Sequence, residues 1–372
     1  MRYKCRKLCF HRTVLSDLPR NILDEILMCL PFQDVVRTSI LSKKWRNIWH
    51  GLPVLTLSHT IWKPEEDLPD LTNNLVKIIN HILIFHTGPV TKFTLCVPYL
   101  DTCPNIDNLI RFLSRNDIQQ IVLRLPIRGS LYKMPLSFFK CFELRHLTLQ
   151  NCSIPDQPSF KGFDRLISLE LRDVAISPKL LERLISRSLL LEQLVLQISG
   201  ASSHVIEISA PNLRSFDYTG NIRSVCLKNI PRLARLSLSH REYYVGVGKC
   251  NIAKFFESFS ALEHLHLNDM VEGDDNDIPA LNSLEVERFS DMTFNHLREV
   301  KLLQTNGTIP EIQLIKLLLA KSPELMKVII EPCLVNEAAT VKVLTELIQF
   351  QRASTKARVV YKSDKHPNPG PV

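Results

Sequence analysis

Residue types capable of catalysis or metal binding are spread thinly through this 372-residue chain. Cys5 and Cys9 have three residues between them and His11 close by, but no second ligand pair follows at the spacing of a zinc site. Segment 246–250 lacks the earlier glycine and the final Ser or Thr of a phosphate-binding loop. The twelve histidines stand apart, and neither a nucleophile elbow nor His-Glu-x-x-His occurs. These patterns predict a protein that is not an enzyme and binds no metal or cofactor; an enzyme is the competing class.

The composition is that of a large folded protein, with 45% hydrophobic and 23% charged residues and a formal net charge of +8. The longest apolar segments, such as 312–320, contain charged or polar interruptions and fall short of the ~18 residues that cross a bilayer. Aromatic residues make up only 7% of the chain, which disfavours a nucleic-acid surface. The ten cysteines are mostly flanked by apolar residues, as buried free thiols are. We expect a cytoplasmic and/or nuclear protein with no membrane or nucleic-acid partner.

The elements that must position any binding residues begin with a helix after residues 16–17, which can cap it. Leu18, Ile22, Ile26 and Leu30 recur every four residues and form an apolar stripe, and Pro31 ends the run. Two further short helices are predicted after Asp34 and Ser42. Three helices in roughly 35 residues fall below the ~40 residues at which a domain usually needs outside support. The stripe must therefore dock on the rest of the chain or on another protein.

These residues resemble an F-box, because Leu18-Pro19, Leu30-Pro31 and Leu41-Ser42-Lys43-x-Trp45-Arg46 follow its order and spacing. The sequence departs from the commoner pattern at Arg20-Asn21, where an acidic residue often follows the first Leu-Pro. The resemblance implies docking on a Skp-type adaptor and, through it, on a cullin–RING ubiquitin ligase. The alternative is an intramolecular helical core. The residues implied to form the docking surface or its immediate support are Leu18, Pro19, Ile22, Ile26, Leu30, Pro31, Val35, Leu41 and Trp45.

Downstream, the pattern apolar-x-x-apolar-x-apolar returns nine times, first at Val90/Phe93/Leu95 and last at Leu297/Val300/Leu302. Most steps between repeats fall within the ~20–29-residue period of leucine-rich repeats, each of which supplies one strand and an outer helix or turn. Helical runs are predicted at 105–115, 178–190 and 251–259, and an amphipathic helix at 68–85 is expected to cap the first strand. The spacing predicts an irregular solenoid.

Within each repeat strand the leucines face the core, so the side chains between them face outward on the concave sheet. Their mixed polar character suits a protein or peptide ligand better than a small molecule. Most of these positions are expected to be merely solvated, and a minority to matter in an interface. The candidate target-binding residues are His146, Thr148, Glu170, Arg172, Gln193, Gln197, Asp217, Arg235, His264 and His266.

After Pro310 the pattern predicts helix, strand, helix and strand, with strands at 325–330 and 357–361. Segments 317–325 and 350–354 resemble the FBD module of plant F-box/FBD/LRR-repeat proteins. We therefore expect an α/β protein with an N-terminal three-helix F-box at 14–50, degenerate leucine-rich repeats at 51–309, an FBD-like α/β cap at 310–362 and a disordered tail at 363–372.

The resemblance implies the substrate-recognition subunit of an SCF-type ubiquitin ligase, in which the F-box holds the adaptor and the repeats hold an unknown target protein. Such a subunit is non-catalytic, because it acts by bringing target lysines close to a charged ubiquitin-conjugating enzyme. A scaffold or regulatory binder that does not assemble productively with a cullin is the alternative. A target site assisted by a small molecule is a weaker one.

Overall fold

The computed structural model describes residues 18–30, 32–41, 43, 45–58, 68–100, 105–198, 205–221, 224–239, 259–268, 293–305, 307, 309–332 and 344–362. Pro31, residues 251–258 of the helix expected at 251–259, and the expected tail at 363–372 lie outside these residues. The chain divides into two compact units, Met1–Ser130 and Leu131–Val372. Each unit is described by itself.

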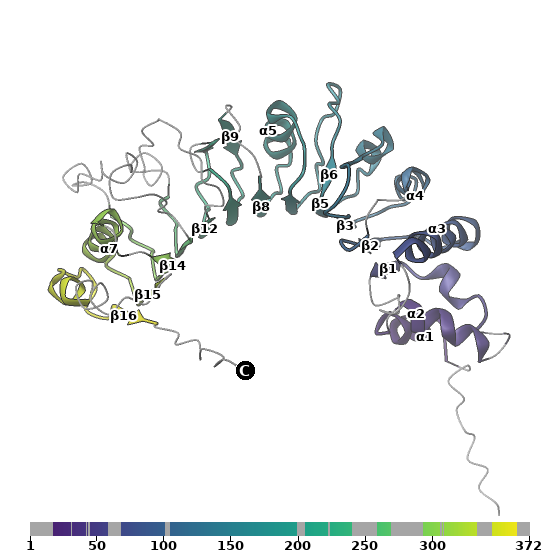
Figure 1. Ribbon diagram of the computed structural model, residues 1–372, viewed down its shortest axis with the longest axis horizontal. Coiled ribbons are helices and arrows are strands. Elements are labelled where there is room, and N and C mark those ends of the chain that lie inside the picture. Colours follow the sequence, from purple (N-terminus) through teal and green to yellow (C-terminus); the bar gives the residue numbers. More distant parts are fainter. Residues whose placement is uncertain are drawn as a thin grey trace, which may run out of the picture. The chain divides into compact units, whose positions relative to one another are not determined.

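The first unit begins with two α-helices and continues with strands and helices in alternation (Figure 1). Its elements are α1 (Arg20–Met28), α2 (Phe32–Arg37), η2 (Thr38–Ile40), η3 (Ile48–Gly51), β1 (Val54–Ser58), α3 (Leu68–Phe85), β2 (Lys92–Cys96), α4 (Asp107–Leu113) and β3 (Gln120–Arg124). Strands β1, β2 and β3 pair in parallel, in that order. Alternating residues of each strand are buried, and Leu75, Ile79 and Ile82 of α3 contribute to the same core.

The segment predicted as the third N-terminal helix has a different structure. Turns occupy 45–47, and the 3-10 helix η3 follows them. Trp45, Ile48 and Trp49 are all buried, and Phe32 meets Trp49 edge to face at a centroid distance of 6.0 Å. The turns and the 3-10 helix bury the same three side chains that an α-helix would have placed on one face, because their spacing is i, i+3 and i+4. The three-helix form of the F-box therefore stays a prediction.

The second unit is built around parallel strands that pair in chain order, with two small two-stranded sheets beside them. Its elements are β4 (Tyr132–Lys133), η5 (Leu136–Lys140), β5 (His146–Gln150), β6 (Cys152–Ser153), β7 (Ser168–Arg172), α5 (Pro178–Arg187), β8 (Gln193–Gln197), β9 (Ile206–Ser209), β10 (Ser215–Thr219), β11 (Val225–Lys228), β12 (Arg235–Ser239), β13 (His264–Asn268), β14 (Glu299–Thr305), α7 (Ile309–Lys321), β15 (Lys327–Pro332) and β16 (Arg358–Tyr361). A further helix spans 344–349.

The main sheet of this unit follows the order β5, β7, β8, β10, β12, β13, β14, β15, β16. Figure 1 shows α5 and α7 on one side of these strands, and we call the opposite side the open face. The leucines of the repeat pattern point toward the helix side and are almost fully buried. The parallel stacking predicted from the leucine spacing is thus confirmed for the described strands.

The layer behind β5 and β7 contains a cluster of phenylalanines in place of an α-helix. Phe138, Phe139, Phe160 and Phe163 are buried, and their neighbouring ring centroids lie 4.8 to 5.6 Å apart in tilted and edge-to-face pairs. Aromatic rings fill the volume that a helix fills behind β8, where Leu180, Leu181, Leu184 and Ile185 of α5 are buried. Repeats of unequal construction can therefore share one continuous sheet.

Candidate protein-binding surfaces

Helix α1 carries apolar residues on two faces, of which only one is buried. Leu23 and Leu27 lie in the core of the first unit at 2% and 1% exposure. Ile22, Ile26 and Leu30, four residues apart, are 43%, 37% and 41% exposed. This spacing places Ile22 and Ile26 on one outer face of the helix, and Leu30 follows two residues after the helix ends. An aligned apolar face of this kind is an unusual feature of a solvated surface.

The residues that follow α2 add to the exposed apolar surface. Val35 is buried, whereas Val36, Ile40 and Leu41 are exposed, the last two at 86% and 66%. Thr38 closes the end of α2 by donating its hydroxyl to the Val35 carbonyl oxygen at 2.6 Å. We call Ile22, Ile26, Leu30, Val36, Ile40 and Leu41 the exposed apolar set of the first unit.

Of the nine residues predicted for adaptor docking, Pro31 is not described and the other eight divide by burial. Pro19, Ile22, Ile26, Leu30 and Leu41 are exposed, Leu18 is partly buried, and Val35 and Trp45 lie in the core. The buried pair can support the docking surface but cannot touch a partner. Val36 and Ile40 were not predicted, although their apolar type next to the listed residues could have indicated them. The docking role of all these residues stays a prediction.

A stack of aromatic and histidine rings joins the end of this N-terminal module to α3. Trp49 stacks on His81 at 5.4 Å, His81 lies 4.4 Å from Phe85, and Phe85 stacks on His50 at 5.8 Å. Burial, followed by the nearby His81 and His86, lowers the pKa of His50. Trp49 and His50 therefore fix the N-terminal module to α3 through its His81 and Phe85 side chains.

The open face of the second unit presents three rows of side chains, because the strands pair without a shift from β5 to β14. The first row is His146, Ser168, Gln193, Ser215, Arg235, His264, Glu299, Lys327 and Arg358. The middle row is Thr148, Glu170, Val195, Asp217, Ser237, His266, Lys301, Ile329 and Val360. The third row is Gln150, Arg172, Gln197, Thr219, Ser239, Asn268, Leu303 and Glu331.

All ten residues predicted for target binding lie in these rows. His146, Gln193, Arg235 and His264 are in the first row, Thr148, Glu170, Asp217 and His266 in the middle row, and Arg172 and Gln197 in the third. The sequence prediction ended at β13 and missed Glu299, Lys301, Lys327 and Arg358. The alternation in Leu297-x-x-Val300-x-Leu302 could have indicated Lys301. Whether any of these residues contacts a target stays a prediction.

A hydrogen-bonded network connects β5, β7 and β8 on the open face. Glu170 accepts from Thr148 at 3.2 Å and from Arg172 at 2.5 Å, and Arg172 also donates to Gln197 at 3.3 Å. Gln197 in turn donates to Asp173 at 2.8 Å. The polar side chains of this part of the face are therefore held in place by one another before any ligand arrives.

Asp217, Ser237 and His266 lie side by side in the middle row, on β10, β12 and β13. Burial raises the pKa of Asp217, while nearby Arg172 and His266 and a hydrogen bond from Ser237 partly oppose the shift. Ser237 lies between Asp217 and His266 and donates a hydrogen bond to the Asp217 carboxylate. In a nucleophilic triad the histidine lies between the serine and the carboxylate, so this order differs from a triad. The arrangement suits recognition by hydrogen bonds.

His266 has a more restricted environment than its neighbours. Its Nε2 lies 3.7 Å from a Glu299 carboxylate oxygen, and that nitrogen is buried with no hydrogen-bond partner among the described residues. Burial lowers the pKa of His266, and the nearby Glu299 carboxylate opposes this.

The part of the chain that the structure describes was predicted to hold neither a metal site nor a membrane span. There, no group of three or more His, Cys, Asp or Glu residues is arranged to hold a metal ion. The described helices include none that is both long and apolar enough to span a membrane. Cys5, Cys9 and His11 lie outside the described residues.

Comparison with known proteins identifies two regions of this chain. Residues 15–57 match the F-box domain model, and residues 106–254 match the model of the LRR repeats of FBD-associated F-box protein At5g56370. F-box/FBD/LRR-repeat protein At1g13570 of Arabidopsis thaliana is 30% identical over 94% of this chain and 98% of its own length. FBD-associated F-box protein At1g66310 of the same plant is 32% identical over 56% of this chain and 46% of its own. A solved Leptospira interrogans LRR protein is 15% identical over 80% of this chain, with a TM-score of 0.24.

Proposed function

The chain belongs to the plant F-box/FBD/LRR-repeat family, and on that premise we propose that it is the substrate-recognition subunit of an SCF-type cullin–RING ubiquitin ligase. The F-box docks on a Skp-type adaptor, and the open face of the repeats holds a target protein. The subunit supplies no catalytic group. It raises the effective concentration of target lysines at the ubiquitin-conjugating enzyme, which is a proximity effect.

The single observation that carries this proposal is the unburied apolar face of α1. Ile22 and Ile26 of α1, and Leu30 just beyond its end, retain roughly two-fifths of their surface in the folded chain, although Leu23 and Leu27 of α1 are buried. An apolar side chain that becomes buried contributes about 1.5–3 kcal/mol. A helical partner that covers this face together with Ile40 and Leu41 gains the share of that free energy that corresponds to the surface still exposed.

The rest of the chain has defined roles in this proposal. Residues 14–50 are the three-helix F-box that docks on the adaptor, the repeats at 51–309 present the target, and residues 310–362 act as an FBD-like cap. The ten predicted open-face residues contribute to the target interface. The complex acts in the cytoplasm, the nucleus or both.

The proposal is tested by co-purification of the full chain with a plant Skp-type adaptor. The double variant I22E/I26E places charge on the exposed face without touching Leu23 or Leu27. The affinity for the adaptor should fall about a hundredfold, as expected when two apolar side chains at the centre of an interface are lost. The milder I22S/I26S variant should give a smaller loss in the same direction.

The matched control is Y99E/I127E, which changes two exposed apolar residues elsewhere in the same unit. It should retain the adaptor fully. Equal adaptor binding by wild type, I22E/I26E and Y99E/I127E would show that α1 is not the docking face. Adaptor binding without recovery of the cullin would instead favour the scaffold alternative.

A further inference from the structure

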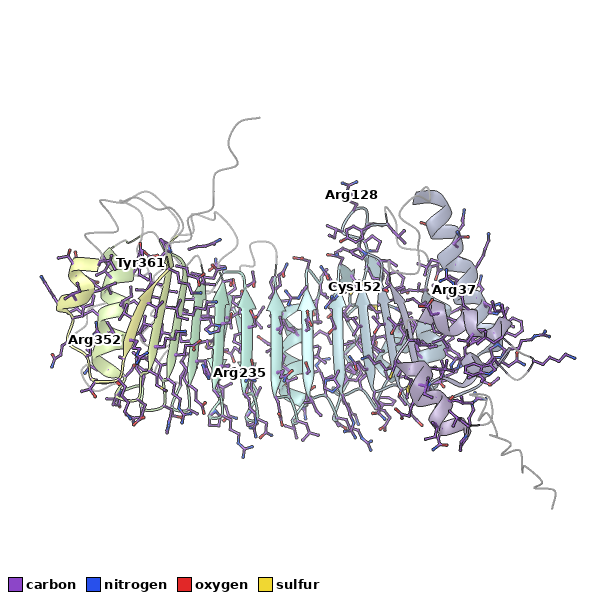
Figure 2. All side chains as sticks on the ribbon, turned by 90° about the horizontal axis from the view of Figure 1, so that it is seen from below. Arg37, Arg128, Cys152, Arg235, Arg352 and Tyr361 are labelled. Carbon is purple, nitrogen blue, oxygen red and sulfur yellow. The ribbon has the colours of Figure 1, made fainter. Side chains whose placement is uncertain are left out.

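The two halves of the open face differ in the charge that they present. From β5 to β10, Glu170 and Asp217 occupy the middle row and Arg172 is tied to Glu170 by a salt bridge. From β12 to β16, the rows carry Arg235, Lys301, Lys327 and Arg358. Figure 2 shows the sheet with its side chains from below and labels Arg235 among them.

Three of these cations are exposed at the same end of their strands. Arg235, Lys327 and Arg358 are the first residues of β12, β15 and β16 and belong to the first row. Within the described part of the chain, none of the three has an ion pair. Neighbouring strands are about 4.8 Å apart, so the four intervals from β12 to β16 span about 19 Å. An extended peptide of about six residues covers that distance.

The acidic residues of the same region are fewer and partly engaged. Glu331 is paired with Lys362 at 2.9 Å, and Glu299 lies near His266. Glu263 directly precedes β13, next to Arg298, which directly precedes β14. Positive charge therefore predominates along the first row, and it extends its attraction over about 10 Å at 0.1 M salt.

We propose that the open face from β12 to β16 binds an anionic segment of the target protein, laid across the strands over Arg235, Lys327 and Arg358. The inference rests on the proposed function and names the chemistry of its target. Arginine guanidinium groups form bidentate hydrogen bonds with carboxylate and phosphate groups. The negatively charged oxygens of the segment can therefore come from Asp and Glu side chains or from phosphorylated residues. Nucleic acid is disfavoured because the three rows from β12 to β16 contain no Phe, Tyr or Trp to stack on bases.

The test measures fluorescence anisotropy of labelled peptides with the purified full chain at low and at 0.3 M salt. The probes are an octa-aspartate peptide, a peptide with four phosphoserines, an uncharged Gly-Ser peptide and a 20-base-pair DNA duplex. The variant R235E/K327E should weaken binding of both anionic peptides on the order of tenfold, as expected for reversal of two exposed charges. The neutralising variant K327Q/R358Q should give a smaller loss.

The matched control is K140E/R145E, which reverses two exposed charges ahead of β5 in the same unit. Loss with R235E/K327E but not with K140E/R145E supports the proposal, and the tighter of the two anionic peptides identifies the source of the negative charge. The proposal is overturned if R235E/K327E and K140E/R145E weaken binding of the anionic peptides equally, or if the Gly-Ser peptide binds as tightly as the anionic peptides. It is also overturned if the DNA duplex binds more tightly than the peptides and loses as much affinity in R235E/K327E. Because I22E/I26E should still bind octa-aspartate and R235E/K327E should still bind the adaptor, failure here is distinguishable from failure of the proposed function.

Discussion

The Arg20 guanidinium donates from Nη2 to the Ile48 carbonyl oxygen at 2.8 Å, and so joins the first turn of α1 to the first residue of η3. Its Nε also contacts the Asp24 carboxylate at 3.2 Å, one turn further along the helix. The departure at this position from the commoner F-box pattern therefore has a structural use. The long cationic side chain thereby links α1 to the backbone of η3.

Replacing Arg20 with Met should lower the free energy of unfolding of the first unit by about 1 kcal/mol, because one partly buried charged hydrogen bond is lost. All three tryptophans, Trp45, Trp49 and Trp62, lie in this unit, so denaturant unfolding followed by tryptophan fluorescence reports on it. R37M is the control, since the ion pair of Arg37 with Asp34 is exposed and its loss should cost less than about 0.5 kcal/mol. A cost for R20M no larger than that of R37M would contradict the bracing role.

Gly88 lies against Gly51, and no side chain fits between them. A Cβ at Gly88 would lie 2.6 Å from the Gly51 oxygen and 2.7 Å from its Cα, and both atoms belong to the backbone. G88A should therefore destabilise the first unit by about 2 kcal/mol through overpacking. The neighbouring T87A keeps the bond from the Thr87 amide to the His50 carbonyl and should have little effect. Matching denaturation midpoints for G88A and wild type would show that the two backbones can separate freely.

Variants of Trp45 and Leu41 should affect stability and adaptor binding differently. Both residues were predicted for the docking surface, but Trp45 is buried and Leu41 is exposed. W45A removes a buried ring and should cost about 3–5 kcal/mol. L41A alters a side chain that is 66% exposed and should change stability by less than about 0.5 kcal/mol while weakening adaptor binding severalfold. Thermal unfolding and adaptor titration of both variants check this. A large loss of stability in L41A would place Leu41 in the core.

Much of the fold could be predicted because it repeats. The spacing in Leu147-x-Leu149 and its equivalents fixes the strand and its buried face, and parallel stacking then sets which side chains become neighbours. The short pairs β4–β6 and β9–β11 could not be predicted in this way. Runs of two to four residues carry too little periodicity, and their pairing depends on how neighbouring repeats stack.

The candidate sites were predictable to a similar extent and for the same reason. Alternation assigned Asp217 and Arg235 to the open face without any structure. It could not show that Val35 faces inward while Val36 faces outward, because a six-residue helix has barely two turns to define its faces. Nor could alternation show the hydrogen bond between Arg20 of α1 and Ile48 of η3, because these residues are 28 positions apart and belong to no repeated pattern.

Acid should destabilise the first unit through His86. This side chain is buried, its Nε2 lies 3.0 Å from the Leu52 carbonyl oxygen, and burial lowers its pKa below the ordinary 6.5 despite the backbone hydrogen bonds. The unfolded chain then binds the proton more tightly, so the free energy of unfolding decreases as the pH falls below about 6.5. H86Q should flatten this slope in tryptophan-monitored unfolding between pH 7.5 and 5.5. H146Q, in the second unit, should leave it unchanged. A slope equally steep in H86Q would assign the effect to other groups, such as His50.

The negative charge of Asp217 should lower the free energy of unfolding of the second unit. Burial raises its pKa, so the folded chain holds the proton more tightly than the unfolded chain, and the charged form present at pH 7 is the disfavoured one. D217N removes the charge and keeps the size, and it should stabilise the second unit at pH 7 by a few tenths of a kcal/mol, since solvent screens a half-exposed group. The gain should shrink as the pH is lowered from 7 toward 4, because wild-type Asp217 then becomes protonated and loses its penalty.

Hydrogen exchange of the β10 and β12 amides at pH 7 and pH 5 measures this gain locally in the intact chain. T219N, which also places an amide on the open face of β10, is the matched control and should show no pH-dependent gain. Stability that is lower in D217N than in wild type at pH 7 would mean that the bond from Ser237 and the nearby Arg172 outweigh burial. A penalty retained in the native sequence agrees with a carboxylate kept for a binding partner, as expected of functional sites that give up stability.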